Sequence, residues 1–522
     1  MTIRDIMGMI EIRSSHITRF GENRRILSLC HNSRYATPNS LFFCKGGALT
    51  DGHIYAPHAY KNGARLFIAE RELDLPPDAS VIIVPNTQEA LCKLAVWFYR
   101  EPAKSLRIIG ITGTKGKTTV ALSVYGIASE AGVRIGYIGT NGVYFNGQRL
   151  ETANTTPDVL ELQKTLRSMV DAGIDTVVIE VSSQALWQNR TYGIEFDTCV
   201  FTNLYEDHIG GVEHPTFEHY RDSKKKLFTD YKVQNIVINA DSEYSHYMLD
   251  GVQCANVITT SAKGDKNCAL YAGYTKKTRD GIIPGISFVC FGGINADISF
   301  KSDGQNIFMR APGLHNVENG LNTVAVCMLL GISPEFIAES FARLSVPGRF
   351  EVITLKSRPD SLFVIDYAHN GASLTAVLKA LREYEPERII CLFGSVGGRT
   401  FGRRSELGAV ARENADVIIL TSDNPNNESP MSVINEINAA IGETDKPVYM
   451  IPDREKAIEK AVEISRAGDY VLLAGKGHET YQLICGERIP FSEQEILYHV
   501  DKLNLIDADE PSTAEKIPEP IV

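Results

Sequence analysis

The stretch GITGTKGKTTV, residues 110–120, constrains the fold of this chain more than any other feature. It follows an apolar run, LRIIGIT, and leads into a pattern that predicts a helix over 117–131. A glycine-rich turn between a strand and a helix lets backbone N–H groups wrap a phosphate, whose negative charge the helix N-terminus also favours. The sequence therefore predicts a nucleotide-binding α/β domain around this turn.

Side chains of the same stretch suit the phosphates of ATP. Lys117 would reach the β- and γ-phosphates, and Thr118 or Thr119 would face Mg²⁺. The match to the strict pattern GxxxxGK[ST] has one departure, because Ile111 stands where the first glycine belongs. The helix-opening KTT and the flanking strand still favour a phosphate-binding loop over an incidental glycine-rich turn.

Strand and helix patterns alternate around this motif, which indicates an α/β fold. Apolar runs such as RIGYIG, TVVIEVS and TCVFTN are separated by helical patterns, one of them over 159–172. A more β-rich segment (ISFVCFGG, ADISF) and a helix over 317–330 follow. The alternation predicts a central parallel sheet with helices on both faces.

At 522 residues the chain is too long for one core. EPAK, at 101–104, precedes a new strand, and a turn at 344–353 precedes a third series of strands: LFVIDYA, IICLFGS, DVIILTS, PVYMIP and YVLLAG. We expect three domains: a smaller α/β domain at 1–103, a central P-loop domain at 104–346 and a C-terminal Rossmann-like domain at 347–506. An acidic, proline-rich tail at 507–522 would be disordered.

Composition narrows the class of protein. The net charge of −11 argues against general binding to nucleic acid or to a membrane surface. Ten cysteines without a CxxC pair indicate reduced thiols and no zinc site. No apolar stretch approaches the roughly 18 residues that span a bilayer, and the N-terminus does not read as a signal peptide. We therefore expect a cytoplasmic protein without membrane insertion.

The spacing GxTGTxGKTT resembles that of the Mur ligase family, and further motifs of this family occur in order along nearly the whole chain. They are NTTPD (154–158), EVSSQAL (180–186), FTNLYEDH (201–208), YRDSKKKLF (220–228), HNVEN (315–319), GRFE (348–351), DYAHN (366–370), DNPN (423–426) and GKGHE (475–479). Each is weak alone, but nine in collinear order are hard to obtain by chance. The resemblance is strongest to the members that add the third amino acid of the peptidoglycan stem peptide.

This resemblance implies a UDP-sugar domain, an ATPase domain and an amino-acid domain. It also implies that ATP phosphorylates the side-chain carboxylate of D-Glu in UDP-MurNAc-L-Ala-D-Glu, after which an amine attacks the acyl phosphate. Cations must neutralise the charge of the two approaching anions. Two Mg²⁺ ions are implied, with Glu180 and His208 as ligands. Lys224, carbamylated by CO₂ in relatives, would support the second ion, so Lys117, Glu180, His208 and Lys224 are the expected catalytic residues.

The resemblance also assigns contacts to ATP, with Arg349 as a bidentate phosphate clamp. The expected ATP-binding residues are Gly113, Thr114, Lys115, Gly116, Lys117, Thr118, Thr119, Asn316, Arg349, Asp366 and His369. The expected UDP-sugar contacts are Ser33, Asn154, Thr155, Thr156, Ser182, Gln188 and Arg190. Two departures occur here, NSR for DSR at 32–34 and EVSSQAL for EVSSHAL. Gln184 still donates and accepts hydrogen bonds, so we interpret both departures as small adjustments of the UDP-sugar site. They also leave open a paralogue that acts on a modified acceptor substrate.

The loop TSDNPNNESP, at 421–430, is expected to wall the amino-acid pocket through Asp423, Asn424, Pro425 and Asn426. Relatives that add meso-diaminopimelate carry Arg after this proline, whereas those that add L-lysine tend to have Asn or Ala. An amide makes no charge-assisted pair with a distal carboxylate, so Asn426 favours L-lysine. Glu428 reads either as a contact of a distal ammonium or, more often, as a solvated loop residue.

Three further residues complete the expected pocket. The segment GSVGGRTFGRR departs from the family pattern GGDRDKGKR but keeps Arg399, which would hold the α-carboxylate. Glu479 would meet the α-amino group, and Gly475 would supply a backbone contact.

Several alternatives remain open from the sequence. In the first, the reaction is the same but the amine is meso-diaminopimelate or ornithine instead of L-lysine. In the second, the chain is a nucleotide-binding paralogue without ligase activity. A folate-type polyglutamate ligase would lack the DNPN loop and the UDP-sugar domain. We expect a monomer that binds the UDP-MurNAc-dipeptide and a diamino acid, and no nucleic acid.

Overall fold

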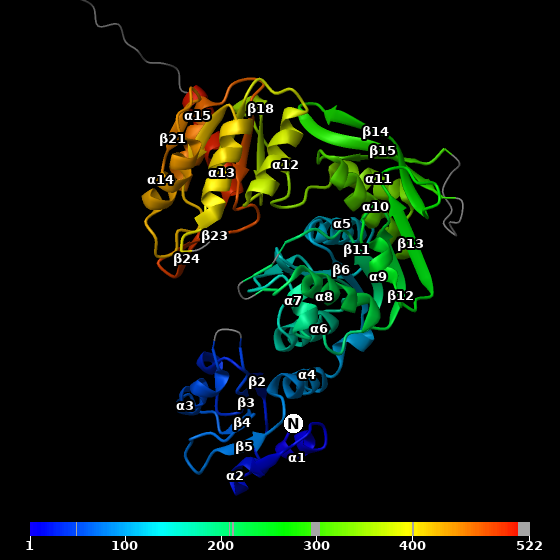
Figure 1. Cartoon of the computed structure of the whole chain (residues 1–522), viewed down its shortest axis with the longest axis vertical. Helices are drawn as coiled ribbons and strands as arrows, with labels where there is room; N and C mark the ends of the chain where they lie inside the picture. The colour runs from blue at the N-terminus through cyan, green and yellow to red at the C-terminus, as the bar shows by residue number, and fades with distance from the viewer. Residues whose placement is uncertain (48–49, 208, 211–212, 294–302, 399–400, 510–522) are drawn as a thin grey trace, which may run out of the picture. The chain divides into compact units, whose positions relative to one another are not determined.

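The computed structural model describes residues 1–509 apart from 48–49, 208, 211–212, 294–302 and 399–400 (Figure 1). The expected three-domain α/β fold is confirmed, since three large sheets succeed one another along the chain. By its internal contacts the chain divides into two compact units. The first holds Met1–Ala272, Cys290–Gly304 and Glu318–Ile337, and the second holds Gly273–Val289, Gln305–Val317 and Ala338–Val522.

The N-terminal sheet has five strands in the order β1-β5-β4-β3-β2. All pairs are parallel except β1–β5. The strands are β1 (Ser14–His16), β2 (Ser28–Cys30), β3 (Ser40–Phe43), β4 (Leu66–Ala69) and β5 (Ser80–Ile83), and the helices are α1 (Ile3–Met7), α2 (Arg19–Glu22), α3 (Ala56–Lys61) and α4 (Thr87–Phe98). The apolar runs SLFF and LFIA are buried throughout, because both faces of a parallel sheet are covered.

The central sheet has eleven strands in the order β16-β15-β14-β13-β12-β11-β6-β10-β7-β8-β9. The strands are β6 (Arg107–Thr112), β7 (Ile135–Gly139), β8 (Gly142–Phe145), β9 (Gln148–Leu150), β10 (Thr176–Glu180), β11 (Phe196–Phe201), β12 (Val233–Asn239), β13 (Asn256–Ser261), β14 (Leu270–Asp280), β15 (Ile283–Gly292) and β16 (Gln305–Met309). The helices are α5 (Lys117–Glu130), α6 (Val159–Asp171), α7 (Ser183–Trp187), α8 (Phe217–Thr229), α9 (Ser245–Leu249), α10 (Leu314–Leu329) and α11 (Pro334–Arg343).

Strand β6 lies at the middle of the parallel part of this sheet, between β10 and β11. The carboxyl ends of these three strands therefore meet at one edge, where ligands of open α/β sheets bind. The glycine-rich turn follows β6 and leads into α5, so it occupies this edge. Two antiparallel pairings, β7–β8 and β8–β9, extend the other side of the sheet and were not predicted from the sequence.

The C-terminal sheet has six strands in the order β17-β18-β22-β19-β20-β21, parallel except for the β17–β18 pair. The strands are β17 (Glu351–Leu355), β18 (Arg358–Asp366), β19 (Ile389–Phe393), β20 (Val417–Leu420), β21 (Val448–Met450) and β22 (Tyr470–Ala474), and a hairpin follows as β23 (Tyr481–Ile484) and β24 (Glu487–Pro490). The helices are α12 (Gly371–Arg382), α13 (Phe401–Asn414), α14 (Pro430–Ile441), α15 (Arg454–Ile464) and α16 (Glu493–Asp509).

Both faces of the C-terminal sheet are packed, as in a doubly wound fold. Along β19, Ile389 and Cys391 belong to the core under α12, α13 and α14, whereas Ile390 and Leu392 belong to the core under α15 and α16. Cys391 is therefore a small buried hydrophobe, as the apolar run around it predicted.

The predicted helices differ from the observed ones by a few residues. The expected spans 117–131, 159–172 and 317–330 correspond to α5, α6 and α10. Helix α16 extends to Asp509, past the expected start of the tail at 507, and 510–522 lie outside the described residues. The predicted strand ADISF also lies outside them. All ten cysteines are free thiols, and no helix in the described part of the chain is both long and apolar enough to cross a membrane.

Candidate active site

Two glycines give the turn after β6 its shape. Gly113 has a φ of +151°, and a Cβ there would lie 1.9 Å from Oγ1 of Thr202. Gly116 has a φ of +84° as the N-cap of α5, and a Cβ there would lie 2.3 Å from Oδ1 of Asn319. A side chain at either position would be both strained and crowded. The sequence therefore needs glycine here, although the first glycine of the strict pattern is missing.

The lysines of the turn are engaged with its backbone and its neighbours. Nζ of Lys117 donates hydrogen bonds to the carbonyl oxygens of Gly113 (2.8 Å) and Thr114 (3.1 Å). Nζ of Lys115 forms an ion pair with Asp207 at 2.9 Å and is exposed. A phosphate at this turn would find both ammonium groups at the N-terminus of α5, which is the environment that an anion requires.

Glu180 lies at the end of β10 and is completely buried. Its Oε2 accepts hydrogen bonds from Oγ1 of Thr118 (2.8 Å) and Oγ1 of Thr140 (3.1 Å). Its Oε1 accepts hydrogen bonds from the hydroxyl of Tyr137 (2.5 Å) and from the backbone N–H of Thr140 (2.9 Å). Four donors thus hold a buried carboxylate in one orientation beside the phosphate turn.

Carboxylate and hydroxyl oxygens are the ligands that Mg²⁺ prefers. Glu180 and Thr118 supply such oxygens at hydrogen-bonding distance from each other, so these residues fit the expected metal. Of the two threonines that the sequence left open, Thr118 and not Thr119 contacts Glu180. No group of three acidic, histidine or cysteine side chains that would hold a metal by itself occurs among the described residues, and His208 lies outside them.

Lys224 lies in the middle of α8 and its side chain is 1% exposed. Its Nζ donates a hydrogen bond to the carbonyl oxygen of Gly113 at 2.8 Å and lies 4.5 Å from the ring centroid of Tyr220. Burial lowers the pKa of Lys224 well below that of an exposed lysine, and the nearby ammonium of Lys117 lowers this pKa further. A buried lysine whose pKa is lowered is thus held against the phosphate turn.

Four of the expected UDP-sugar contacts, Thr156, Ser182, Gln188 and Arg190, form one hydrogen-bonded chain that ends at the backbone of Glu180. Oγ1 of Thr156 donates to the backbone carbonyl of Glu180 (2.7 Å) and accepts from the backbone N–H of Ser182 (3.0 Å). Arg190 donates to the carbonyl of Thr156 (2.9 Å) and, through Nη2, to Oε1 of Gln188 (2.8 Å). These side chains therefore move together with the carboxylate that faces the phosphate turn.

Three more expected sugar contacts are placed by local bonds. Oγ1 of Thr155 lies 3.1 Å from Oγ1 of Thr140, and the backbone carbonyl of Asn154 accepts a hydrogen bond from Thr152. Ser33 contacts Nδ1 of His58 at 2.9 Å. Asn32, which replaces the usual Asp, accepts a hydrogen bond from the backbone N–H of Arg34 and caps the 3-10 helix Ser33–Tyr35. An asparagine therefore retains the capping function of an aspartate here.

In the C-terminal domain, the loop after β18 gathers the side chains expected near ATP. Asp366 accepts hydrogen bonds from the backbone N–H groups of Phe350 (2.7 Å) and Ala368 (2.8 Å), and burial raises the pKa of its carboxyl. The guanidinium of Arg349 lies 4.7 Å from the ring centroid of Tyr367. Nδ1 of His369 bonds the carbonyl of Tyr367 at 2.8 Å. Tyr367 thus organises two of the expected residues, and its aromatic ring was not singled out from the sequence.

Asn316 lies in the first turn of α10. Its Nδ2 donates a hydrogen bond to the carbonyl of Pro312 at 2.7 Å. This bond fixes the start of the helix, and a role of Asn316 toward ATP stays a prediction.

The DNPN loop (423–426) follows β20 and the GKGHE loop (475–479) follows β22, and the two loops are bonded to each other. Nζ of Lys476, which is buried, donates to Oδ1 of Asn424 (3.0 Å) and to Oε2 of Glu479 (2.7 Å). Asn424 in turn donates to Oε2 of Glu479 at 2.9 Å. Gly475, with a φ of +108°, packs against Asp423, and a Cβ there would lie 2.9 Å from Oδ2. The expected amino-group ligand Glu479 is therefore held rigidly.

Asn426 has a left-handed backbone with a φ of +54°. Its Nδ2 donates hydrogen bonds to the carbonyls of Gly397 (3.1 Å) and Asn424 (3.3 Å), so its amide joins the loop to the segment after β19. Among residues other than glycine, Asn is one of the few that adopt this conformation readily. The backbone conformation therefore explains why residue 426 is asparagine, without reference to which amine the enzyme uses.

Glu428 is half-buried, and its carboxylate is paired within the protein. It forms a two-pronged ion pair with the buried guanidinium of Arg404 at 2.7 and 2.8 Å, and it accepts a hydrogen bond from the backbone N–H of Gly398. Arg404 also bonds Glu436 at 2.8 Å. These contacts lower the pKa of Glu428 to about 2, chiefly through the hydrogen bonds from Arg404.

A cavity of 740 Å³ opens between these loops and the β23–β24 hairpin. Its lining residues are Val396, Gly397, Gly398, Asn424, Asn426, Asn427, Glu428, Glu479, Tyr481 and Leu483. Three of the expected amino-acid residues, Asn424, Asn426 and Glu479, thus border one cavity. Arg399, the expected ligand of the α-carboxylate, lies outside the described residues.

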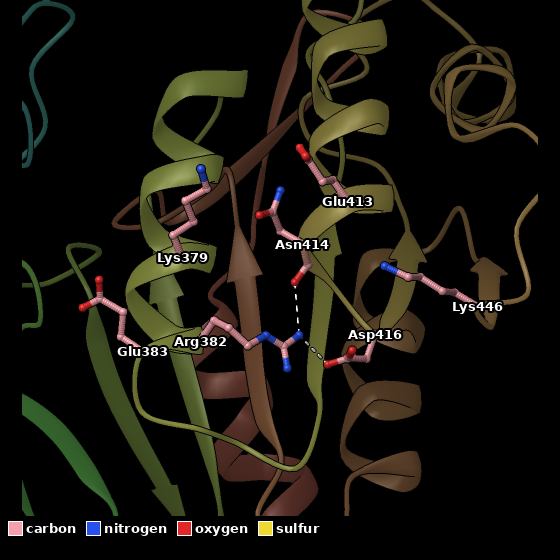
Figure 2. Close-up of a pocket in the computed structure, with 7 residues that line it drawn as sticks. All are labelled: Lys379, Arg382, Glu383, Glu413, Asn414, Asp416 and Lys446. Atoms are coloured by element: carbon pink, nitrogen blue, oxygen red, sulfur yellow. Dashed lines mark hydrogen bonds and ion pairs between the residues drawn. The ribbon is translucent and has the colours of Figure 1, made fainter.

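A second cavity, of 430 Å³, lies at the opposite edge of the same sheet, where α12 and α13 end and β20 and β21 begin (Figure 2). Its lining residues are Lys379, Arg382, Glu383, Glu413, Asn414, Asp416 and Lys446. Arg382 bonds the carbonyl of Asn414 and the carboxylate of Asp416, and Lys446 bonds the carbonyl of Ala415. Cations that satisfy the carbonyl groups at the end of α13 stabilise that helix end, which explains this cluster without a ligand.

Taken together, the fold and these sites define an ATP-dependent enzyme that places a phosphate turn and a pocket for a second substrate on separate parallel sheets. Two family models match the chain, the Mur ligase middle domain over residues 111–327 and the Mur ligase glutamate ligase domain over residues 348–477. The chain therefore belongs to the Mur ligase family and is an ATP-dependent ligase, as the motifs predicted.

The chain is similar over nearly its whole length to curated relatives. It is 36% identical to the UDP-N-acetylmuramoyl-L-alanyl-D-glutamate–2,6-diaminopimelate ligase of Clostridium botulinum, covering 94% of this chain and 98% of the relative. It is likewise 36% identical to the ligase of the same name from Caldanaerobacter subterraneus, covering 93% and 96%. These relatives are named for 2,6-diaminopimelate, which favours the alternative amine over the L-lysine that Asn426 suggested.

Solved structures agree with the fold. A UDP-N-acetylmuramoyl-L-alanyl-D-glutamate–2,6-diaminopimelate ligase superposes with a TM-score of 0.64 at 26% identity, covering 97% of this chain and 99% of that one. The MurF ligase from Thermotoga maritima in complex with ADP superposes with a TM-score of 0.57 at 17% identity, covering 93% and 99%. The second match concerns the fold alone.

Proposed function

We propose that this ligase joins 2,6-diaminopimelate to the D-Glu side-chain carboxylate of UDP-MurNAc-L-Ala-D-Glu, as a UDP-N-acetylmuramoyl-tripeptide synthetase. ATP would transfer its γ-phosphoryl group to that carboxylate, and the amine would displace phosphate from the acyl phosphate to leave an amide, ADP and phosphate. The observation that carries this proposal is the similarity, over more than nine-tenths of both chains, to ligases named for these two substrates.

The choice of amine reverses the preference drawn from the sequence. That preference rested on Asn426, whose amide bonds backbone carbonyls of the protein and whose left-handed backbone favours asparagine. With this residue explained by conformation, the names of the relatives carry more weight than the missing arginine. L-lysine and ornithine become competing substrates to be measured against 2,6-diaminopimelate.

Residues of the chain can be given roles in the first step. Lys117 would leave the carbonyls of its turn to meet the β- and γ-phosphates, and Arg349 would grip phosphate oxygens. Thr118 and Glu180 would hold Mg²⁺, which when bound offsets negative charge as the carboxylate approaches the γ-phosphate. The bonds from Tyr137 and Thr140 keep the Glu180 carboxylate oriented for that role.

Lys224 would carry the carbamate expected for the family. In its uncharged form the amine would attack CO₂, forming an N–C bond and releasing one proton, which leaves an anionic group with two oxygens. The buried position beside Gly113 supports this role because an uncharged lysine is what the reaction with CO₂ needs. A carbamate there would add oxygen ligands for a second Mg²⁺ next to the phosphate turn.

The second substrate would enter through the sugar contacts that end at Glu180. Thr156, Ser182 and Arg190 would bind the nucleotide-sugar while their bonds couple its position to the reaction centre. We further propose the domain limits 1–103, 104–346 and 347–506, a monomer as the active form, and the cytoplasm as the compartment that supplies ATP.

A phosphate-release assay tests this function. Full-length enzyme, ATP, Mg²⁺ and UDP-MurNAc-L-Ala-D-Glu are incubated with 2,6-diaminopimelate, L-lysine or ornithine, and the nucleotide product is identified by mass spectrometry. We expect release and the tripeptide product with 2,6-diaminopimelate. Turnover with L-lysine alone would overturn the proposed amine, and no turnover with any amine would favour the non-ligating paralogue.

A further inference from the structure

Two carboxylates line the 740 Å³ cavity of the C-terminal domain, and they differ in which oxygens can still accept a hydrogen bond from a ligand. Both oxygens of Glu428 are bonded, Oε1 to Arg404 and Oε2 to Arg404 and the backbone N–H of Gly398. Glu479 is bonded through Oε2, and its Oε1 has no hydrogen-bond partner among the residues that the structure describes. Of these two side chains, Glu479 therefore offers the oxygen to which an ammonium group in the cavity can donate.

Lys476 determines which oxygen of Glu479 stays open. Its Nζ donates hydrogen bonds to Oε2 of Glu479 (2.7 Å) and to Oδ1 of Asn424 (3.0 Å), and Nδ2 of Asn424 donates to the same Oε2 (2.9 Å). Oδ1 of Asn424 also accepts from the backbone N–H of Leu483 at 2.9 Å, so this amide cannot turn without losing bonds. The three side chains form a closed triangle that uses Oε2 and leaves Oε1 to a ligand.

The ammonium group of Lys476 is costly where it lies. The side chain is completely buried and is not part of the cavity lining. Besides Glu479, it has Oδ1 of Asp423 at 4.0 Å. An apolar side chain of similar volume would fill the same space without the penalty of removing a charge from water. A buried lysine here therefore calls for an explanation beyond packing.

Joining the two loops does not supply this explanation, because another side chain already joins them. Arg454 donates hydrogen bonds to the carbonyls of Ser422, directly before the DNPN loop, and Ala474, directly before the GKGHE loop. What Lys476 adds to this connection is the orientation of the Glu479 carboxylate.

We propose that Lys476 is a positioning residue for the amine substrate, since by holding Oε2 of Glu479 it presents Oε1 to the α-amino group that attacks the acyl phosphate. This assignment rests on the proposed function. It applies to each candidate amine, because 2,6-diaminopimelate, L-lysine and ornithine share the α-amino group. Lys476 contacts no substrate itself and acts through Glu479.

Lys476→Met, which keeps the length of the side chain and removes its charge, tests this role in the full-length enzyme. We expect the KM values for 2,6-diaminopimelate and L-lysine to rise by the same factor, about 10-fold, the lower limit for losing a hydrogen bond to a charged group. The KM values for ATP and UDP-MurNAc-L-Ala-D-Glu should stay near those of the wild type. Lys446→Met is the matched control, because Lys446 bonds the carbonyl of Ala415 at the opposite edge of the sheet, and it should leave every KM unchanged.

A small nucleophile separates the amino-acid pocket from the chemistry of ATP. Hydroxylamine attacks an acyl phosphate directly, forming an N–C bond while the C–O bond to phosphate breaks, and it needs no pocket for an amino acid. With ATP and UDP-MurNAc-L-Ala-D-Glu but no amino acid, Lys476→Met should form the hydroxamate at the rate of the wild type. A loss of hydroxamate formation equal to the loss of amide formation would assign Lys476 to folding or to the first step and overturn the proposal.

A double variant shows whether Lys476 acts through Glu479. If it does, Glu479→Gln and Lys476→Met/Glu479→Gln should have the same KM for the amino acid, because the group that Lys476 orients is already lost. This comparison also holds if Lys476→Met alone folds poorly, since the double variant removes both charges of the pair. Effects of the two substitutions that multiply would show that Lys476 acts independently of Glu479, which contradicts the proposal.

The outcomes also distinguish this proposal from the function on which it rests. If the wild type forms the amide and Lys476→Met keeps the KM values for both amino acids, the role of Lys476 is refuted and the proposed function stands. If the wild type uses L-lysine but not 2,6-diaminopimelate, the proposed amine is refuted, and the same variants test Lys476 with L-lysine. A wild type that forms neither amide nor hydroxamate would refute the proposed function and the role of Lys476 with it.

Discussion

The phosphate turn and the DNPN loop occupy equivalent places, each at the carboxyl end of a parallel strand, yet their side chains are used differently. Around the turn, polar groups converge on Glu180 and Gly113 from strand β7 and from helices α5 and α8. In and beside the DNPN loop, polar groups instead bond to other groups of the protein. Asn426 donates hydrogen bonds to backbone carbonyls, and Glu428 pairs with Arg404.

This difference decides how far a residue type predicts chemistry. A buried carboxylate and a buried lysine beside a phosphate turn are costly, and folding alone does not explain them. An asparagine at a left-handed backbone position costs little free energy and stabilises the loop by itself. The first kind of residue therefore predicts function from its type, whereas the second predicts it only after its conformation is known.

The largest expected effect concerns the phosphate turn. Lys224→Ala should lower kcat by at least about 10³-fold, since it removes both the buried amine and its proposed carbamate. Partial rescue by bicarbonate with a short carboxylate would support an anionic role. Lys226→Ala, two residues along the same helix, is the matched control and should retain turnover. Equal activities of the two variants would remove the distinction drawn between the two regions.

The sequence predicted this region well because its motifs are local. The strand–turn–helix unit, Lys117, Thr118 and Glu180 all came from short patterns, and the structure brings them together. Tyr137 and Thr140 were missed, because they approach Glu180 from β7 and the turn after it, about forty residues earlier in the chain. A buried tyrosine in a strand reads as core, and only the strand order β6-β10-β7 shows what its hydroxyl meets.

The amino-acid region was predicted less well for the same reason. Its strands and loops were recognised, but the partner of Glu428 comes from another element, Arg404 on α13, and Glu479 is paired with Lys476 of its own loop. In the sequence Arg404 stood only within the segment GSVGGRTFGRR, and Lys476 only within the GKGHE motif. Which charges are free for a substrate depends on these pairings, and spacing in the sequence does not reveal them.

The next expected effect is on stability beneath the DNPN loop. Arg454 is fully buried, pairs with the buried Glu493 at 2.8 Å, and donates to the carbonyls of Ser422 (3.1 Å) and Ala474 (2.8 Å). Arg454→Ala leaves Glu493 uncompensated and should lower the unfolding free energy by about 3–5 kcal/mol. Urea denaturation followed by circular dichroism measures this loss.

The control for this variant is an exposed pair in the same helix. Lys460→Ala breaks the ion pair with Glu463 on the surface of α15 and should change stability by less than about 0.5 kcal/mol. A similar small change in Arg454→Ala would show that the ends of β20 and β22 are held together by packing alone, and the loop would then not depend on its buried charges.

A smaller effect should appear in acid. The pKa of Glu428 lies near 2, below its ordinary value of 4.5, so the contribution of the Arg404 pair to stability is complete above pH 4.5 and is lost as the pH falls toward 2. Glu428→Gln should therefore be less stable than the wild type at neutral pH, and the difference should shrink across this range. Denaturation midpoints measured at several pH values test the sign, with Glu463→Gln as the control. A difference that grows in acid would contradict the pairing.

The smallest expected effect tests the conformational explanation of Asn426. Asn426→Gly keeps the left-handed backbone without strain and should change stability by less than about 0.5 kcal/mol. Asn426→Ala places an ordinary side chain at a φ of +54° and loses the bonds to Gly397 and Asn424, so it should cost about 1–2 kcal/mol.

Neither variant should change the ratio of kcat/KM for 2,6-diaminopimelate and L-lysine, because the amide of Asn426 bonds backbone carbonyls of the protein. Steady-state kinetics with both amino acids measure this ratio. If Asn426→Gly shifts it toward either substrate while stability is unchanged, Asn426 contacts the amine directly. The DNPN loop would then select its substrate through residue type as the phosphate turn does, and the difference between the two regions would be one of degree.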